Sequence, residues 1–157
     1  MQIHQDFQWL DPNARGASVA MGNFDGVHLG HRSVIDLARG HGPLGIITFE
    51  PHPRQFFAPH APAFRLMNAE ARANRLAKLG VEHLFQLPFN RALAALTPEE
   101  FAGKVLAGGL GIGHIVVGAD FCFGKGRTGT ADDLRTLGDC FGFATTIAPL
   151  VEIAGRE

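Results

Sequence analysis

Short runs of apolar and β-branched residues alternate along the chain with segments in which apolar positions recur at helical spacing. This alternation is typical of βαβ units, in which helices cover both faces of a parallel sheet. The runs that we interpret as strands are residues 17–22, 44–49, 81–87, 113–118 and 143–148. The pattern predicts an α/β fold, a Rossmann-like open parallel sheet of about five strands in the order 3-2-1-4-5, with helices on both faces.

Two of the intervening helices are specified by residues at their ends. Residues 68–79 begin with Asn68, a favourable N-cap, and stop before Gly80, which suits the position that follows a helix. Residues 97–107 open with Thr97 in a capping box. Both segments are therefore predicted to be helical.

Composition places the chain among globular proteins with one domain. It has 157 residues, of which 46% are hydrophobic and 18% charged, and its formal net charge is −1. This charge balance argues against a nucleic-acid partner. No apolar run approaches the ~18 residues that span a bilayer, and the N-terminus lacks the pattern of a signal peptide. We expect no membrane partner and, by default, a cytoplasmic protein.

The two cysteines, Cys122 and Cys140, form no CxxC pattern. A structural zinc site would need four ligands at regular spacing, and a disulfide framework would need more cysteines than these. We therefore expect two buried thiols.

The predicted strand order brings two glycine-rich loops together. In an open parallel sheet a ligand binds beyond the carboxyl ends of the strands, where the strand order reverses. Residues 22–31 follow the first strand, and residues 118–129 follow the fourth. The order 3-2-1-4-5 makes these strands neighbours, so we expect their loops to lie side by side.

The first loop has the features of an anion site. The strand ends at Gly22 and a helix starts near His28, so the free N–H groups of a helix N-terminus face the crevice. His28 and His31 share one face of that helix, and Gly30 lets a ligand approach the backbone. A tight turn with incidental histidines is the alternative. Metal ligation would need further ligands, and neither the Walker A nor the GxGxxG pattern is present.

The second loop combines glycines with charge. Asp120, Lys125 and Arg127 lie among four glycines, an arrangement that suits a mobile loop around a polyphosphate. Phe121 and Phe123 could stack on a flat ring or belong to the core. An ordinary solvated surface loop is the alternative.

A third element follows the second strand. Residues 51–66 contain four prolines and cannot form a helix, and the length of this tract favours a functional or mobile loop. Its prolines stiffen a turn around His52, beside Phe56 and Phe57. A flat heterocycle would fit this aromatic wall. The alternative is a rigid surface loop whose phenylalanines cover the core.

Three motifs occur in order along the chain: GNFDGVHLGH at 22–31, FEPHP at 49–53 and VGADFCFGKGRTG at 117–129. Together they resemble the FMN adenylyltransferase module of bacterial FAD synthetases, the N-terminal half of the bifunctional riboflavin kinase and FMN adenylyltransferase. The similarity runs from about residue 15 to the end. The HxGH element alone marks the wider nucleotidyltransferase superfamily, and the other two motifs narrow it to this family.

The resemblance implies transfer of AMP from ATP to FMN, which gives FAD and pyrophosphate with Mg²⁺. The attacking phosphate is already anionic, so such an enzyme needs alignment and charge neutralisation more than a nucleophilic side chain. The implied catalytic residues are His28 and His31. The implied ATP-binding residues are Gly22, Asn23, Phe24, Asp25, Gly30, Gly118, Lys125 and Arg127. The implied FMN-binding residues are Pro51, His52, Pro53, Phe57, Asp120 and Phe123. Asp120 is also the candidate ligand for Mg²⁺.

The family normally continues with a SerSerThrxxIleArg motif that completes the ATP site, and then with a riboflavin kinase domain. Neither is found in this sequence, so we expect residues 1–157 to be an adenylyltransferase domain truncated at its C-terminus, with turnover weakened or lost and without kinase activity. The kinase domain is the expected partner in a full-length family protein. Two other functions remain open. One is a noncatalytic nucleotide- or flavin-binding module, and the other is an adenylyl- or cytidylyltransferase for another phosphorylated acceptor.

Overall fold

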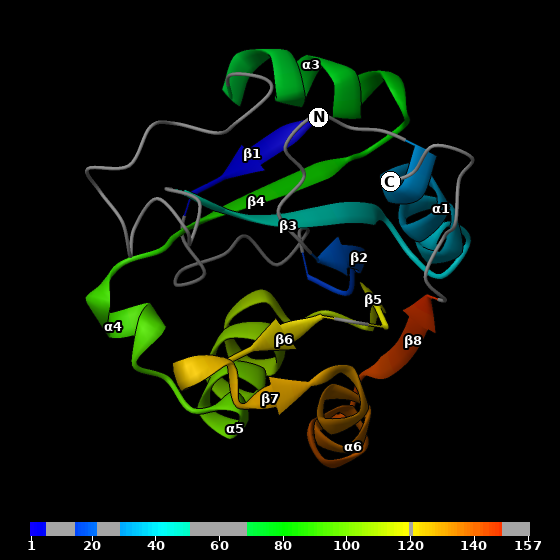
Figure 1. The fold of residues 1–157 in the computed structure, drawn as a ribbon. Coiled ribbons are helices and arrows are strands. Elements are labelled where there is room, and N and C mark those ends of the chain that lie inside the picture. Colours follow the sequence, from blue (N-terminus) through cyan, green and yellow to red (C-terminus); the bar gives the residue numbers. More distant parts are fainter. Residues whose placement is uncertain (6–14, 22–28, 51–68, 120, 149–157) are drawn as a thin grey trace.

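The chain is described by a computed structural model, which covers residues 1–5, 15–21, 29–50, 69–119 and 121–148. Its centre is a six-stranded sheet in the order β1-β4-β3-β2-β5-β8, and every neighbouring pair is parallel (Figure 1). In that order the strands are β1 Gln2–His4, β4 His83–Pro88, β3 Leu44–Glu50, β2 Ser18–Met21, β5 His114–Gly118 and β8 Ala144–Ala148. The predicted open parallel sheet is confirmed.

The five predicted strands correspond to β2, β3, β4, β5 and β8, and they keep the predicted order 3-2-1-4-5. Their bounds differ from the predicted ones by at most two residues. Strand β1 is an addition at the edge, where it pairs with β4. It was not predicted because its three residues include one apolar side chain, Ile3, which is 48% exposed and leaves no pattern of burial in the sequence.

Four helices cover the two faces of the sheet (Figure 1): α1 Leu29–Ala38, α3 Ala69–Lys78, the π-helix η2 Phe101–Leu110 and α6 Ala131–Phe141. Adjacent strand residues point to opposite faces. Val19 belongs to a buried cluster with residues of η2 and α6, whereas Ala20 belongs to a second cluster with Ile35 of α1 and Leu76 of α3. Helices therefore cover both faces, as the sequence predicted.

The predicted start of one helix and the predicted end of the other are confirmed. The backbone N–H of Glu100 donates to the Thr97 hydroxyl at 3.1 Å, and the Thr97 N–H donates to the Glu100 carboxylate at 2.9 Å. The hydrogen bond from the Thr97 backbone lowers the pKa of Glu100. Gly80, two residues after the end of α3 Ala69–Lys78, adopts a φ of 90°, as a residue following a helix commonly does. Asn68 lies outside the described residues.

The helix predicted for residues 97–107 is longer and wider than expected. After α5 Pro98–Glu100 it continues as the π-helix η2 to Leu110, before Gly111 with a φ of 61°. Arg15, remote in the sequence, donates to the carbonyls of Gly109 at 2.9 Å and Gly108 at 3.2 Å. Gly111 is a local signal for the end of η2, and the Arg15 side chain adds a long-range contact by satisfying carbonyls that a helix end leaves free.

Residues 118–129 do not form the simple loop that the sequence suggested. Strands β6 Cys122–Phe123 and β7 Gly129–Thr130 pair as an antiparallel hairpin, with the 3₁₀ turn η3 Lys125–Arg127 between them. A short helix, α4 Arg91–Ala94, precedes α5. The positive φ values of two glycines in and beside the turn, 79° and 64°, allow the chain to reverse within so few residues.

A buried chain of hydrogen bonds joins three strands at the amino end of the sheet. The Ser18 hydroxyl lies 2.7 Å from the carbonyl oxygen of Ala38, the last residue of α1, and must donate its one proton there. His114 Nδ1 lies 2.8 Å from the same hydroxyl oxygen and so donates to it. His114 Nε2, 2.7 Å from the Thr146 hydroxyl, then accepts in the neutral imidazole. This network fixes the end of α1 to the sheet.

Burial, followed by the charge of His41, lowers the pKa of His114. The two imidazole rings are 4.4 Å apart, and the residue is only 4% exposed. Both effects disfavour the imidazolium, so the neutral form is the one that supports the fold.

We therefore expect stability to fall as the pH drops below about 6.5, the ordinary pKa of histidine and that of the unfolded chain. Because the folded pKa is lower, the unfolded state binds more protons in the window between the two values. The contribution of His114 is fully present above this window and is lost as the pH falls through it. Urea unfolding from about pH 8 to 5 should show a shallower acid slope for His114→Asn than for the wild type. Equal slopes would contradict the assignment.

Candidate functional site

The carboxyl edge of the sheet gathers the segments that carry the candidate chemistry. Strand β2 pairs with β3 on one side and with β5 on the other, and all three run in the same direction. Their carboxyl ends, Met21, Glu50 and Gly118, therefore open onto one edge. The strands that lead into the two glycine-rich segments are neighbours, as predicted. Helix α1 begins at Leu29, so its N-terminus lies at this same edge.

The structure describes part of the predicted site. Outside the described residues lie Gly22, Asn23, Phe24, Asp25, His28, Pro51, His52, Pro53, Phe57 and Asp120. The backbone alone is described for Gly30, His31 and Arg127. Gly30 and His31 occupy the first turn of α1, and Arg127 closes η3. Gly118, Phe123 and Lys125 are described in full, and they come from the end of β5 and from the hairpin that follows it.

The β6–β7 hairpin is attached to the rest of the chain through Lys125. The backbone N–H of Lys125 donates to the carbonyl of Leu96 at 2.7 Å, and the Thr128 hydroxyl donates to the Lys125 carbonyl at 2.9 Å. These bonds hold the turn between the strands, while the residue itself is exposed. The predicted loop thus contains a defined turn, which presents the ammonium group of Lys125 to solvent.

Five phenylalanines form a continuous row of ring contacts. From Phe89 the row passes to Phe49 at 5.7 Å, to Phe101 at 6.3 Å, to Phe123 at 5.9 Å and to Phe121 at 6.2 Å between ring centroids. Aromatic pairs at such separations add to the free energy of burial. The row connects the ends of β3 and β4, the start of η2 and the hairpin.

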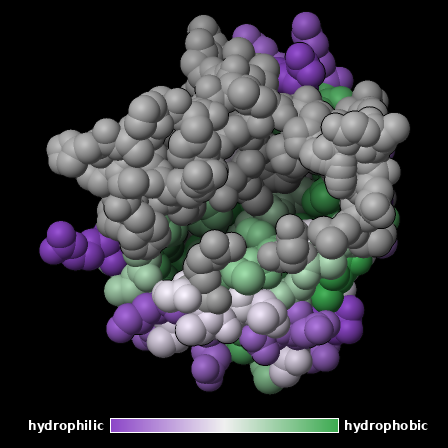
Figure 2. Space-filling model, in the orientation of Figure 1, coloured by the Kyte–Doolittle hydropathy of each residue, from purple (hydrophilic) through white to green (hydrophobic). Residues whose placement is uncertain are grey.

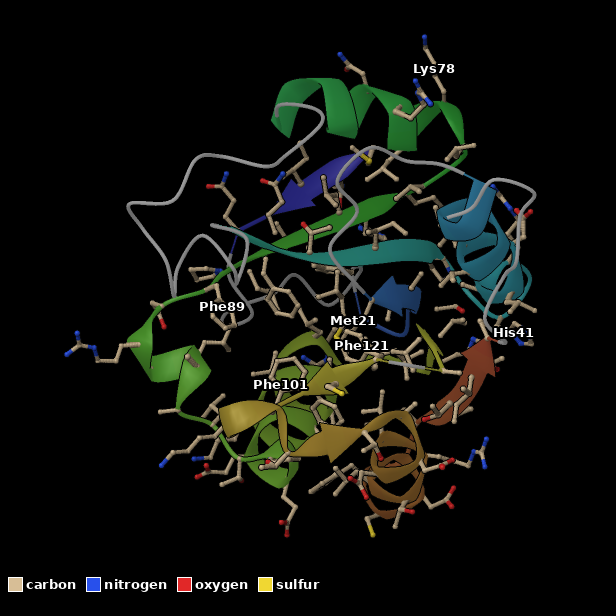
Figure 3. The ribbon with its side chains drawn as sticks, viewed as in Figure 1. Met21, His41, Lys78, Phe89, Phe101 and Phe121 are labelled. Carbon is tan, nitrogen blue, oxygen red and sulfur yellow. The ribbon has the colours of Figure 1, made fainter. Side chains whose placement is uncertain are left out.

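The two ends of the row are its more accessible members. Phe123 is only 6% exposed and belongs to the buried core, whereas Phe89 and Phe121 are partly buried and pack against it. Phe121 packs against the buried cluster that contains Met21, and both side chains are labelled in the central part of Figure 3. Figure 2 shows apolar surface in the middle of this view, above a band of polar residues. The sequence left open whether Phe121 or Phe123 belongs to the core. The structure assigns Phe123 to the core.

Sequence reasoning missed Phe49, Phe89 and Phe101 as neighbours of the candidate site. The first of these stood inside a quoted motif, but the other two lie 40 and more residues further along the chain. Their common feature in the sequence is a phenylalanine beside a strand end or a helix start, which is too frequent to mark a site. The ring contacts arise only when the strands pair.

The prediction of two buried thiols is wrong. Cys122 is half-buried in β6, and Cys140 is exposed. Cys140 lies in the last turn of α6, next to the 44% exposed Phe141, on the side of the helix that faces away from the core. Helical periodicity, rather than residue type, decides its exposure.

Within the described part of the chain, no group of three or more His, Cys, Asp or Glu side chains could hold a metal ion. No helix among these residues is long and apolar enough to cross a membrane. The positive charge of Lys125 and the helix N-terminus of α1 are the features on this edge that suit an anion.

Comparison with known proteins adds independent information. A protein-family model described as FAD synthetase matches residues 10–157. The bifunctional riboflavin kinase/FMN adenylyltransferase of Pseudomonas fluorescens is 38% identical over 160 residues, which cover 99% of this chain and 51% of that protein. The FAD synthetase of Listeria monocytogenes is 36% identical over 150 residues, covering 91% of this chain and 61% of that protein. The chain thus spans about half the length of the first relative.

A solved structure has the same fold. It is described as a macrolide-efflux protein from Streptococcus pneumoniae, and it superposes with a TM-score of 0.81 at 26% sequence identity. The match covers 99% of this chain and 53% of that chain. The same fold therefore forms about half of that larger protein.

The close packing of Phe123 against the hairpin leads to a test. A Cβ at Gly129 would lie 2.8 Å from the Phe123 ring, so Gly129→Ala must displace that ring or the strand. Overpacking of this kind costs about 1 to 3 kcal/mol of stability, which urea denaturation measures. Gly113→Ala is the control, because its Cβ would meet nothing closer than 3.5 Å. Equal losses in the two variants would contradict the tight contact.

Proposed function

Because this chain belongs to the FAD synthetase family, we propose that it transfers AMP from ATP to FMN. A phosphate oxygen of FMN attacks the α-phosphorus of ATP and forms the new P–O bond of FAD. The bond between the α-phosphorus and the bridging oxygen breaks, and pyrophosphate leaves with both electrons of that bond. The anionic nucleophile needs no activation by a protein serine or cysteine, so the enzyme's task is alignment and charge neutralisation.

The arrangement of the carboxyl edge carries this proposal. Strand β2 ends between β3 and β5, so the helix N-terminus of α1 and the hairpin with Lys125 belong to one edge. The N–H groups in the first turn of α1 suit the ATP phosphates, and Lys125 suits the departing pyrophosphate. His28 and His31 are the proposed catalytic residues, since His31 stands in that first turn.

The proposed flavin site lies beyond the carboxyl end of β3. Pro51, His52, Pro53 and Phe57 follow β3 directly, and the aromatic row brings Phe123 and Phe121 toward the same edge. A flat three-ring flavin gains most from such apolar and aromatic surface. Because Phe121 is the more accessible ring of the pair, we propose it as an additional contact.

Mg²⁺ would neutralise phosphate charge when bound with ATP. A magnesium ion usually takes one or two carboxylates and completes its shell with substrate phosphates and water. Asp120 is the proposed protein ligand.

The first expectation is product formation. Incubation of the chain with ATP, Mg²⁺ and FMN should yield FAD and pyrophosphate, separated from FMN by chromatography, at a lower rate than the relative used as the control. The Pseudomonas fluorescens relative is the positive control. Binding of FMN and ATP without any FAD would favour the noncatalytic binding module. If no FAD forms from FMN but another phosphorylated acceptor is adenylylated, a different transferase of the superfamily would be favoured.

The second expectation concerns His31. Replacing it with Ala should raise the barrier to AMP transfer by about 2.7 to 4 kcal/mol, about 10²- to 10³-fold in kcat, because one preorganised charge stabiliser is lost. His41→Ala is the matched control, since His41 lies beyond the opposite end of α1 beside His114. It should leave kcat unchanged. A large loss of melting temperature in His31→Ala, with kcat retained, would make that histidine structural.

A further inference from the structure

Two buried hydroxyl groups among the described residues have no hydrogen-bond partner. They are Oγ1 of Thr48 in β3 and Oγ1 of Thr145 in β8. Thr48 is fully buried. An unpaired hydroxyl in the interior costs free energy, and a valine of nearly the same shape would avoid that cost. A threonine kept at such a place calls for an explanation other than packing.

The two threonines stand at opposite ends of the sheet. Thr48 lies near the carboxyl end of β3, one residue beyond the last pair of β2 with β3, Met21 with Ile47. Thr145 pairs with Ile115 near the amino end of β5. The first hydroxyl is therefore at the edge that the proposed reaction uses, and the second is remote from it.

Thr48 has a polar neighbour on an otherwise apolar face. It shares the face of Ile46, which packs with residues of α1 and α3, and its partner on β4 is Gln86, which is 8% exposed. Neighbouring strands lie about 4.8 Å apart, so the hydroxyl and the amide can act on one group. Both are uncharged, and each can donate and accept. That chemistry suits an alcohol rather than a phosphate.

We propose that Thr48 serves acceptor recognition, and that its hydroxyl binds a hydroxyl of the ribityl chain of FMN. This inference rests on the proposed function, which places the flavin after β3. The chain between the ring and the phosphate of FMN carries three hydroxyl groups, so it is the part of this acceptor that Thr48 and Gln86 match. Because Oγ1 is enclosed, side chains at the edge must shift when the acceptor binds.

The proposal makes stability and recognition change in opposite directions for Thr48→Val. The substitution removes an unpaired polar atom and keeps a β-branched side chain in a strand, so the melting temperature should rise by about 2 to 6 °C. The same substitution should weaken FMN binding by about three- to tenfold, as loss of one neutral hydrogen bond does. The KM for ATP should not change.

Two further variants and one analogue isolate the hydroxyl. Thr48→Ser keeps the oxygen and should bind FMN as the wild type does. Thr145→Val removes the other unpaired hydroxyl and should gain stability with unchanged FMN affinity. Lumiflavin has the flavin ring without the ribityl chain, so its affinity should be the same in the wild type and in Thr48→Val. Quenching of flavin fluorescence measures each dissociation constant.

The outcomes separate this inference from the proposed function. If the wild type binds FMN and Thr48→Val binds it equally well, ribityl recognition by Thr48 is wrong while the proposed function stands. An equal loss of affinity for FMN and lumiflavin would also overturn it, because the substitution would then act on the ring or on the fold. If the wild type binds neither flavin and forms no FAD, both proposals fail.

Discussion

Parallel pairing of β2 with both β3 and β5 is the constraint on which the rest of this structure depends. Parallel strands end at the same edge, so the segments that follow these three strands all start at the carboxyl edge of the sheet. Reversal of the chain's direction of winding at β2 opens the crevice in which α/β sheets bind ligands. The N-terminus of α1 and the β6–β7 hairpin start from the same edge because each follows one of these parallel strands.

Packing below that edge is dominated by aromatic rings. Phe49 and Phe101 join the end of a central strand to the start of η2, and Phe123 extends the contacts into the hairpin. The hairpin has only two residues in each strand, too few for independent stability. Its position depends on the Phe123 ring and on the backbone bond from Lys125 to Leu96. The surface proposed for the flavin is therefore supported by the same rings that stabilise the fold.

Buried polar groups occur at both ends of the sheet. At the amino end, Ser18, His114 and Thr146 satisfy one another and hold the last carbonyl of α1. Toward the carboxyl end, Thr48 keeps a hydroxyl without a partner. Thr145, near the amino end, also has a buried hydroxyl without a partner, so the position of Thr48 at the carboxyl edge, and not its missing partner alone, supports a role in binding.

The sequence by itself determined the five main strands, their order, the capped helix starts and the family, because these follow from short-range periodicity, local caps and linear motifs. Only the tertiary structure decided that β1 adds an edge strand, that Arg15 binds the last carbonyls of η2, that five phenylalanines form one row and that Thr48 lacks a partner. Each of these depends on groups far apart along the chain. Their distances are set by how strands pair and helices pack, and no local pattern records that information.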